Sequence, residues 1–555
     1  MQTRNLVYTL TAIAVALIVV IGGLSLLVLS GGDDDDGGAA NPDDTGEEGP
    51  DLGDRIEGEL RLFGADPQTM DPACATDAGS AEYIVEIFSG LVSFDKDLNV
   101  IPDIAADWVV SDDGTVYTFN LRTNVLFHDN SRRVSAEDFK YSMQRALSPD
   151  TQSTVGDVYL DDIVGAEEYS IGEADEVTGI KVVNADTLEL TIKEPSEVFL
   201  EKLTYPTAYV VDQREVGDAT CFEANWTLTP NGTGPFKLTD WDLGTSITLE
   251  PNEGFYLEPK PTLSKVTYVL SGGSAFTMYE NDELDITGVG INNIESVRDP
   301  SNPLNAEYHQ GDSLNVFYIG FNVNEPPFDD PDVRRALSMA VDKEFLANEF
   351  LEQLVVPAAG IIPPGMPGYN DDLAGLEFNP GAAADLLDET GKADDVDGAR
   401  ILTSGQGAAP SDILQALAAM WEENLGVTIE IEQEDFGLFL SDINEGNFTM
   451  FSLGWIADYP DPQNFLDIKL HSESSNNESG YASDEVDALL EQARSEPDEA
   501  SRIDLYQQAE QIIVDDAPWI PLYHGRSSYL VKPEVVGFET PPFVIPNLRY
   551  VSIDR

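Results

Sequence analysis

The chain has 555 residues, 42% of them hydrophobic and 9% aromatic, which is enough apolar material for folded lobes and too much chain for a single core. Its 102 Asp and Glu residues against 29 Lys and Arg leave a formal net charge of -73, which excludes nucleic acid as a partner because no basic face can be assembled. The excess of acids also suggests adaptation to high salt, where screening relieves self-repulsion.

The first element is an uncharged apolar run from Leu6 to Ser30, which is long enough to span a hydrocarbon layer of roughly 30 Å as a helix. Arg4 precedes the run and acids follow it, so the positive-inside tendency keeps residues 1–5 in the cytoplasm and places the rest outside. The sequence therefore predicts a cell membrane protein with a single-pass transmembrane anchor at 6–30. A cleaved signal peptide is the alternative.

The next tract, residues 31–54, is rich in glycine and acids and has no apolar periodicity, which predicts an extended, disordered linker. The chain contains two cysteines, Cys74 and Cys221. In an oxidising compartment such a pair either forms a disulfide or remains as two separate buried thiols, and both interpretations stay open because sequence alone does not show proximity.

Strand patterns dominate from residue 55 to about residue 310. The segment 58–64 reads as a first strand, and apolar residues alternate within 116–122 and 187–192, so each of these predicts a strand with one face against a core. One clear helix interrupts them: Ser135 and Asp138 form a capping box before apolar residues at helical spacing.

Beyond residue 310 strands and helices alternate, which predicts an α/β lobe. Asp330 and Pro331 suit the N-cap and first position of a helix. A second helix begins near Ser411 and ends at Leu425 and Gly426, before a strand with Val427, Ile429 and Ile431 on one face. Helical periodicity also covers 483–494 and 498–515.

Six segments, in order, carry a resemblance to a known family. They are MDPACATDAGSAEYIVEIFSGLVSFD, IAADWVVSDDGTVYTFNLRTNVLFHD, SAEDFKYSMQRAL, GTGPFKL, FNVNEPPFDDPDVRRALSMAVDK and GWIADYPDPQNF. The chain resembles the family 5 extracellular solute-binding proteins, the oligopeptide-, dipeptide- and nickel-binding components of ABC importers. The resemblance implies a two-lobed, periplasmic-binding-protein-like α/β clamp of type II that binds solute between its lobes and closes by a hinge motion.

By the same resemblance, the chain crosses between lobes near residues 313 and 520. We expect lobe I at 55–98, 198–312 and 521–555, a subdomain inserted into lobe I at 99–197, and lobe II at 313–520. The implied partners are a short peptide or similar small solute, an ABC permease with its ATPase, and the membrane through the N-terminal helix. We expect a monomer.

The segment 450–462 holds the best candidate site. Trp455 offers a flat wall, and Asp458 offers a carboxylate that can accept charge-assisted hydrogen bonds from a ligand ammonium. Proteins resembling this chain pair the carboxylate at the Asp458 position with a peptide α-amino group, and Gly454 lies beside it. Ser452 stands where some relatives carry a cation for the ligand carboxylate, which puts recognition of a C-terminus in doubt.

Five further residues are ligand-binding candidates. Gly79 and Ser80 follow the first strand and, by resemblance, border the cleft, where glycine permits close approach of a ligand backbone. Tyr523 and His524 lie where the chain returns to the first lobe, and Tyr141 lies on the capped helix; each has a polar group for hydrogen bonding. A loop, a hinge core or a surface aromatic are their alternative roles.

An exported enzyme is the competing class of function. The four histidines are dispersed, and neither an H-E-x-x-H nor a G-x-S-x-G motif occurs, so the sequence predicts no catalytic residues. With no His/Cys cluster it also predicts no metal site and no cofactor. The same clamp binding a nickel chelate, an opine or an oligosaccharide, or serving a sensor, remains the alternative to peptide import.

Overall fold

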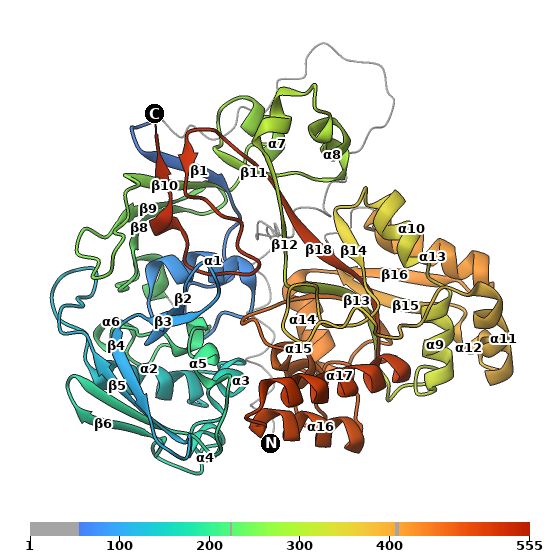
Figure 1. Ribbon diagram of the computed structural model, residues 1–555, viewed down its shortest axis with the longest axis horizontal. Coiled ribbons are helices and arrows are strands. Elements are labelled where there is room, and N and C mark those ends of the chain that lie inside the picture. The colour runs from blue at the N-terminus through green and yellow to red at the C-terminus, as the bar shows by residue number, and fades with distance from the viewer. Residues whose placement is uncertain (1–54, 223–224, 406–409, 555) are drawn as a thin grey trace, which may run out of the picture.

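The structure is a computed structural model that describes residues 55–222, 225–405 and 410–554. The predicted anchor at residues 6–30 and the linker at 31–54 lie outside these ranges. Among the described residues, no helix is both long and apolar enough to span a bilayer. Figure 1 shows two bodies of mixed helices and strands, with long strands running between them, so the predicted two-lobed α/β architecture is confirmed.

The sheet of the first lobe has the strand order β1-β10-β9-β8. Its strands are β1 (Glu59–Phe63), β8 (Phe236–Asp242), β9 (Ser246–Pro251) and β10 (Lys265–Val269). β1 and β10 are parallel, and the other pairs are antiparallel. Helix α1 (Ala78–Ile87) begins after the N-cap Asp77 and buries Tyr83 and Ile84 in the core of this sheet. The first strand predicted from the sequence is thereby confirmed.

A second sheet, of order β4-β5-β7-β6, lies within residues 99–197. Its strands are β4 (Ala105–Val110), β5 (Val116–Leu121), β6 (Ile180–Asn184) and β7 (Thr187–Thr191). The apolar residues that alternate along β5 and β7 are buried, as predicted, and pack against α2 (Ala136–Leu147), whose capping box forms between Ser135 and Asp138. Shorter elements nearby are β2 (Val92–Phe94), β3 (Val100–Pro102), α3 (Gly156–Leu160), α4 (Ala166–Ser170), α5 (Phe199–Lys202) and α6 (Gln213–Val216).

A third sheet, which extends from the second lobe toward the first, follows the order β11-β18-β13-β17-β15-β16, with β12 and β14 also paired to β18. The strands are β11 (Ile286–Gly288), β12 (Tyr308–Asp312), β13 (Asn315–Phe321), β14 (Val355–Pro357), β15 (Ala399–Ser404), β16 (Ile429–Glu434), β17 (Met450–Ile456) and β18 (Trp519–Val531). The helices from residue 275 onward are α7 (Ala275–Glu280), α8 (Ile291–Arg298), α9 (Pro331–Met339), α10 (Lys343–Phe345), α11 (Pro380–Thr390), α12 (Ala393–Val396), α13 (Asp412–Leu425), α14 (Phe436–Glu445), α15 (Gln463–Leu470), α16 (Asp484–Ser495) and α17 (Glu499–Asp516). A short pair, β19 (Val535–Val536) and β20 (Ser552–Ile553), follows them in the chain.

The helix ends predicted in this half are confirmed. Asp330 caps α9 with Pro331 in its first turn, and Ser411 and Gly426 cap the two ends of α13. The apolar faces of α9 and α13 meet one side of the sheet, where Leu337 and Trp421 are fully buried. The Trp421 Nε1 atom donates to the Leu337 carbonyl at 2.9 Å, so the indole keeps a partner in the core.

Strand β18 joins the lobes. Its first residues, 519–523, pair with β13 of the second lobe, and its later residues, 526–531, pair with β12 and β11. In Figure 1 it runs diagonally from the second lobe toward the strands of the first. The β12–β13 segment crosses in the opposite direction beside it, so two adjacent antiparallel crossings form the hinge.

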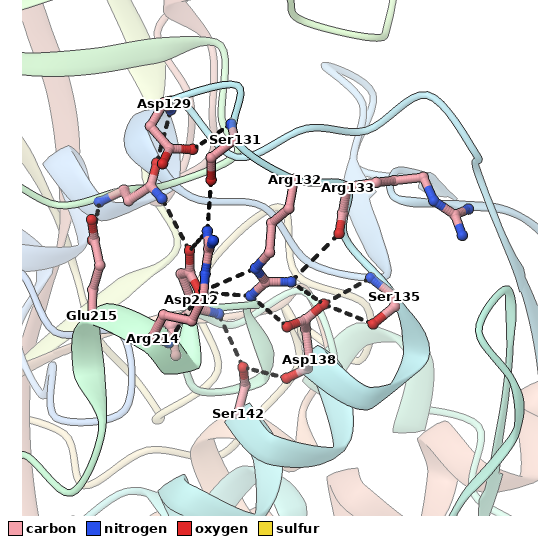
Figure 2. Close-up of polar contacts among 12 residues, drawn as sticks. Asp129, Ser131, Arg132, Arg133, Ser135, Asp138, Ser142, Asp212, Arg214 and Glu215 are labelled. Atoms are coloured by element: carbon pink, nitrogen blue, oxygen red, sulfur yellow. Dashed lines mark hydrogen bonds and ion pairs between the residues drawn. The ribbon is translucent and has the colours of Figure 1, made fainter.

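A buried ionic network fixes the insertion to the first lobe (Figure 2). The Asp212 carboxylate, 1% exposed, caps α6 and accepts from Arg132 at 2.6 Å and from Arg214 at 2.7 Å. Arg132 also reaches Asp138 of the α2 capping box at 2.6 Å. Burial alone would raise the pKa of Asp212, but the hydrogen bonds from the two arginines outweigh it and hold the pKa at about 2.

We predict that Asp212→Asn lowers the free energy of unfolding by about 2 kcal/mol at pH 7, because the part-buried Arg132 loses one of its two carboxylate partners. A depressed carboxyl pKa stabilises the fold above the unfolded value, and this stabilisation is lost as pH falls through about 2. Urea unfolding at pH 7 and below pH 4 measures both effects. Lys96→Ala, which removes an exposed pair, is the matched control and should leave the stability close to that of wild type; equal losses would contradict the prediction.

Candidate ligand-binding cleft

A cavity of about 1610 Å³ lies between the lobes, and we call it the cleft. Its walls come from the loop before α1 and from α3 on one side, and from β13, β17 and α14 on the other. Sites for drug-sized molecules usually measure about 300–1,000 Å³. The cleft is therefore large enough for a ligand longer than a single small metabolite.

Aromatic rings form one wall of the cleft. The Phe317 and Tyr523 rings stack with centroids 5.0 Å apart. Gly454 faces Phe317 across the β13–β17 pair, and a Cβ atom there would lie 2.7 Å from the phenyl ring. Glycine at 454 is thus what allows the Phe317 ring to lie flat against the strand.

Trp455 is held in place from two directions. Its Nε1 atom donates to the Asn464 carbonyl at 3.0 Å and to the Asn464 Oδ1 atom at 3.1 Å. The Lys469 ammonium lies 4.5 Å from the centroid of the indole ring, within range of a cation–π interaction. The indole is a fixed wall of the cleft.

Asp458 faces the cleft at the end of β17. Its Oδ2 atom accepts from the Asn464 side chain at 3.1 Å and from the Tyr159 hydroxyl at 2.5 Å. No hydrogen bond from the described residues reaches its Oδ1 atom. Burial raises the pKa of Asp458 to about 6, against the lowering effect of the hydrogen bonds from Tyr159 and Asn464.

The Tyr159–Asp458 hydrogen bond connects the two lobes. Tyr159 lies on α3, 299 residues before Asp458. Its ring stacks on that of Tyr205 with centroids 3.8 Å apart, and the Tyr205 hydroxyl donates to the Ala75 carbonyl at 3.2 Å. These contacts describe lobes that have closed onto each other.

The structure brings together five of the eight ligand-binding candidates: Gly79, Gly454, Trp455, Asp458 and Tyr523 all line the cleft. It places the other three, Ser80, Tyr141 and His524, outside the residues that line the cleft. Each of these three is engaged inside the fold.

A different contact within the protein holds each of these three side chains. The Ser80 Oγ atom accepts from the Thr69 amide at 3.2 Å, and the residue is fully buried. The Tyr141 hydroxyl donates to the Gly217 carbonyl at 2.6 Å. His524 is adjacent to Tyr523 on β18, and successive strand residues face opposite sides, so its Nδ1 atom meets the Asn315 carbonyl at 2.9 Å instead.

Cys74 and Cys221 are joined by a disulfide whose cysteines both line the cleft. The bond spans a sequence separation of 147 residues. In the chain-entropy account, closing a loop of this length stabilises the fold by about 5 kcal/mol.

Sequence reasoning missed several residues of the cleft. Tyr159, Tyr205 and Phe317 lie in segments without a motif, and only the fold brings them beside Asp458. Asp77, the N-cap of α1, also lies on the wall of the cleft. Across the described ranges, no group of three His, Cys, Asp or Glu residues could hold a metal ion.

Comparison with known proteins agrees with this geometry. The profile of the bacterial extracellular solute-binding proteins, family 5 Middle, matches residues 99–477. The chain is 30% identical over 499 residues to the periplasmic oligopeptide-binding protein OppA of Escherichia coli, covering 86% of this chain and 89% of that protein. It is 31% identical over 490 residues to the probable deoxycholate-binding periplasmic protein YgiS of the same organism, covering 85% and 89%.

Solved structures give the same fold and also report on the arrangement of the lobes. The Escherichia coli murein tripeptide binding protein MppA matches with a TM-score of 0.79 and 27% identity, over 89% of this chain and 98% of that one. The unliganded open form of MppA matches with a TM-score of only 0.66 at 27% identity, over 90% and 98%. The lobes of this chain therefore stand in a different arrangement from that open form, as the Tyr159–Asp458 bond also indicates.

We predict that Gly454→Ala lowers the free energy of unfolding by about 1–3 kcal/mol, because the added methyl group displaces the Phe317 ring from its stack. Gly437→Ala is the control, since it also lines the cleft but its Cβ would meet nothing closer than 3.5 Å. Chemical denaturation of the two variants checks this; a Gly454→Ala variant as stable as Gly437→Ala would refute it.

Proposed function

We propose that this chain, which belongs to family 5 of the bacterial extracellular solute-binding proteins, captures short peptides between its lobes and delivers them to an ABC permease and its ATPase. The observation that carries the proposal is Asp458, a carboxylate at the wall of a large closed cleft with one oxygen open to a ligand. OppA and MppA, its relatives, are named for oligopeptide and murein tripeptide binding. The role is binding, without a reaction on the solute.

In the proposed complex, the α-ammonium group of the peptide donates to the Oδ1 atom of Asp458. Trp455 and the Phe317–Tyr523 pair enclose the first side chains. A neutral ligand would leave the carboxylate buried without a counter-charge, so the site favours amines.

The edge of β17 supports binding of an extended peptide backbone. β15 pairs with β17 at Met450 and Phe451, and within the described residues no strand lies on that side of residues 452–456. Because Gly454 lies in this stretch, a peptide can approach the strand closely and pair with its backbone. Backbone pairing gives affinity without restricting side chains.

The same clamp with a non-peptide solute is the second candidate. The 31% identity to a protein described as a probable deoxycholate-binding periplasmic protein favours it, together with the aromatic wall of the cleft. Nickel chelates, opines, oligosaccharides and a sensor role belong to this same alternative.

As a member of an extracellular family, the chain lies for most of its length outside the cytoplasm. We propose that residues 6–30 remain as a single-pass anchor with residues 1–5 in the cytoplasm, and that 31–54 form the tether. We further propose that the clamp works as a monomer, with lobe I at 55–98, 198–312 and 521–555. Mass spectrometry of the mature protein tests whether residues 6–30 are retained, and light scattering tests whether the clamp is a monomer.

The charge of -73 supports the proposal of a high-salt environment, because salt screens repulsion among the surface carboxylates. The melting temperature should rise between 0.05 M and 2 M NaCl. A melting temperature unchanged by salt would remove this proposal and leave the transport function intact.

For the peptide site, we predict that wild type binds trialanine at least tenfold more tightly than N-acetyl-trialanine in calorimetry at pH 7.5. Asp458→Asn should bind both peptides weakly and equally, because the acetyl group and the substitution remove the two sides of one ion pair. Binding of neither peptide by wild type would reject peptide capture.

The same pair of proteins should differ in pH dependence. Burial raises the pKa of Asp458 to about 6, so the carboxylate takes up a proton as pH falls through that value and loses its attraction for the ammonium. With about one tenth of the groups ionised at pH 5, trialanine affinity should drop roughly tenfold between pH 7.5 and 5, while the peptide amine stays protonated. A profile shared by wild type and Asp458→Asn would show that another group is responsible.

A further inference from the structure

The charges that line the cleft are strongly unbalanced. Among the described residues of the wall, seven carry a carboxylate: Asp66, Asp77, Asp157, Asp412, Glu445, Asp458 and Glu478. Over the same described ranges, Lys469 is the one wall residue with a cationic side chain. That ammonium is ion-paired with the Glu478 Oε1 atom and lies over the Trp455 ring, so it is not available to a ligand anion.

Glu478 is a buried acidic residue in the wall of the cleft. Its side chain is 7% exposed, and while Oε1 meets Lys469, its Oε2 atom is buried without a hydrogen-bond partner. The hydroxyl of Tyr318, a fully buried residue that also lines the cleft, has no partner either. The Glu478 charge helps burial to raise the pKa of Tyr318, so the phenol and the carboxylate lie near each other. A buried acceptor left without a donor lowers the stability of the fold, and a ligand that donates to it removes this penalty.

Asp77 offers a second acceptor, on the opposite lobe. Its Oδ1 atom accepts from the Ser80 amide at 2.8 Å as the N-cap of α1, but its Oδ2 atom is buried without a hydrogen bond. Burial raises the pKa of Asp77. Asp77 and Asp458 both line the cleft, and the charges of both raise the pKa of the Tyr205 phenol.

We propose that the cleft selects cationic ligands, so that peptides with lysine or arginine side chains bind in preference to neutral or acidic peptides of equal length. The α-ammonium group occupies Asp458, and the side-chain cation donates to the open carboxylate oxygen of Asp77 or Glu478. This inference rests on the proposed peptide function and adds the charge class of the ligand.

Two physical effects support this selection. Low-dielectric walls focus the field of the carboxylates into the cleft, which raises the local concentration of cations. Asp77 and Asp458 also carry like charges in the wall of one cleft, and a bound cation offsets their repulsion. An acidic peptide is repelled by the field of the carboxylates, and it adds to the repulsion between them.

Calorimetry at pH 7.5 and low salt with Ala-Ala-Ala, Ala-Lys-Ala and Ala-Glu-Ala tests the proposal. We expect Ala-Lys-Ala to bind at least tenfold more tightly than Ala-Ala-Ala, and Ala-Glu-Ala to bind more weakly than both. The Lys/Ala preference should shrink in 1 M NaCl, where the Debye length falls to about 3 Å. Equal affinity for the three peptides overturns the charge selection and leaves the peptide function standing; no binding by any of them overturns both.

Substitutions locate the acceptor. Asp77→Asn and Glu478→Gln should each be made, and at least one should reduce the Lys/Ala preference, the ratio of the two affinities, threefold or more. Asn still caps a helix well, so Asp77→Asn stays folded even where Glu478→Gln, which strips Lys469 of its partner, lowers stability. Asp498→Asn is the matched control, because Asp498 also caps a helix by accepting from a serine amide, here at 3.0 Å, and lies outside the cleft. An equal loss of preference in Asp498→Asn would show that the overall charge, and not the cleft, sets it.

Discussion

Strand β18 carries both the covalent chain and a hydrogen-bonded ladder from one lobe to the other. It pairs with β13 at 519–523 and with β12 and β11 at 526–531, so both lobes are fastened to the same strand. This ladder holds the two walls of the cleft facing each other. In two-lobed proteins that close on a ligand, a hinge of a few residues absorbs the change in backbone angles.

The chemistry of the cleft follows from where this hinge places polar groups. Asp458 ends β17, close to the crossing, and closure brings Tyr159 onto it from the first lobe. Excluding water there raises the pKa of the carboxyl and also strengthens its attraction for an ammonium group. The aromatic rings at 317, 455 and 523 exclude water from the cleft, and in our proposal the acidic residues favour a positively charged ligand.

Local sequence signals predicted most of the fold and only part of the site. Helix ends at Ser135, Asp330 and Ser411 were predictable because a cap is satisfied by neighbours three residues away. Tyr159 was not, since its role exists only when a residue 299 positions later is folded beside it. His524 was predicted beside Tyr523 as a second ligand contact, although strand alternation sends the two side chains to opposite faces.

The Tyr159–Asp458 hydrogen bond joins the two lobes through protein groups alone, so it favours the closed clamp independently of the solute. Any contact that favours the shut clamp in the absence of solute raises the resting population of empty, shut molecules. Such molecules present the same outer shape to an importer as loaded ones do. The strength of this phenol–carboxylate bond therefore contributes to how often an importer meets an empty, closed clamp, while the open Oδ1 atom lets an ammonium group bind without displacing the tyrosine.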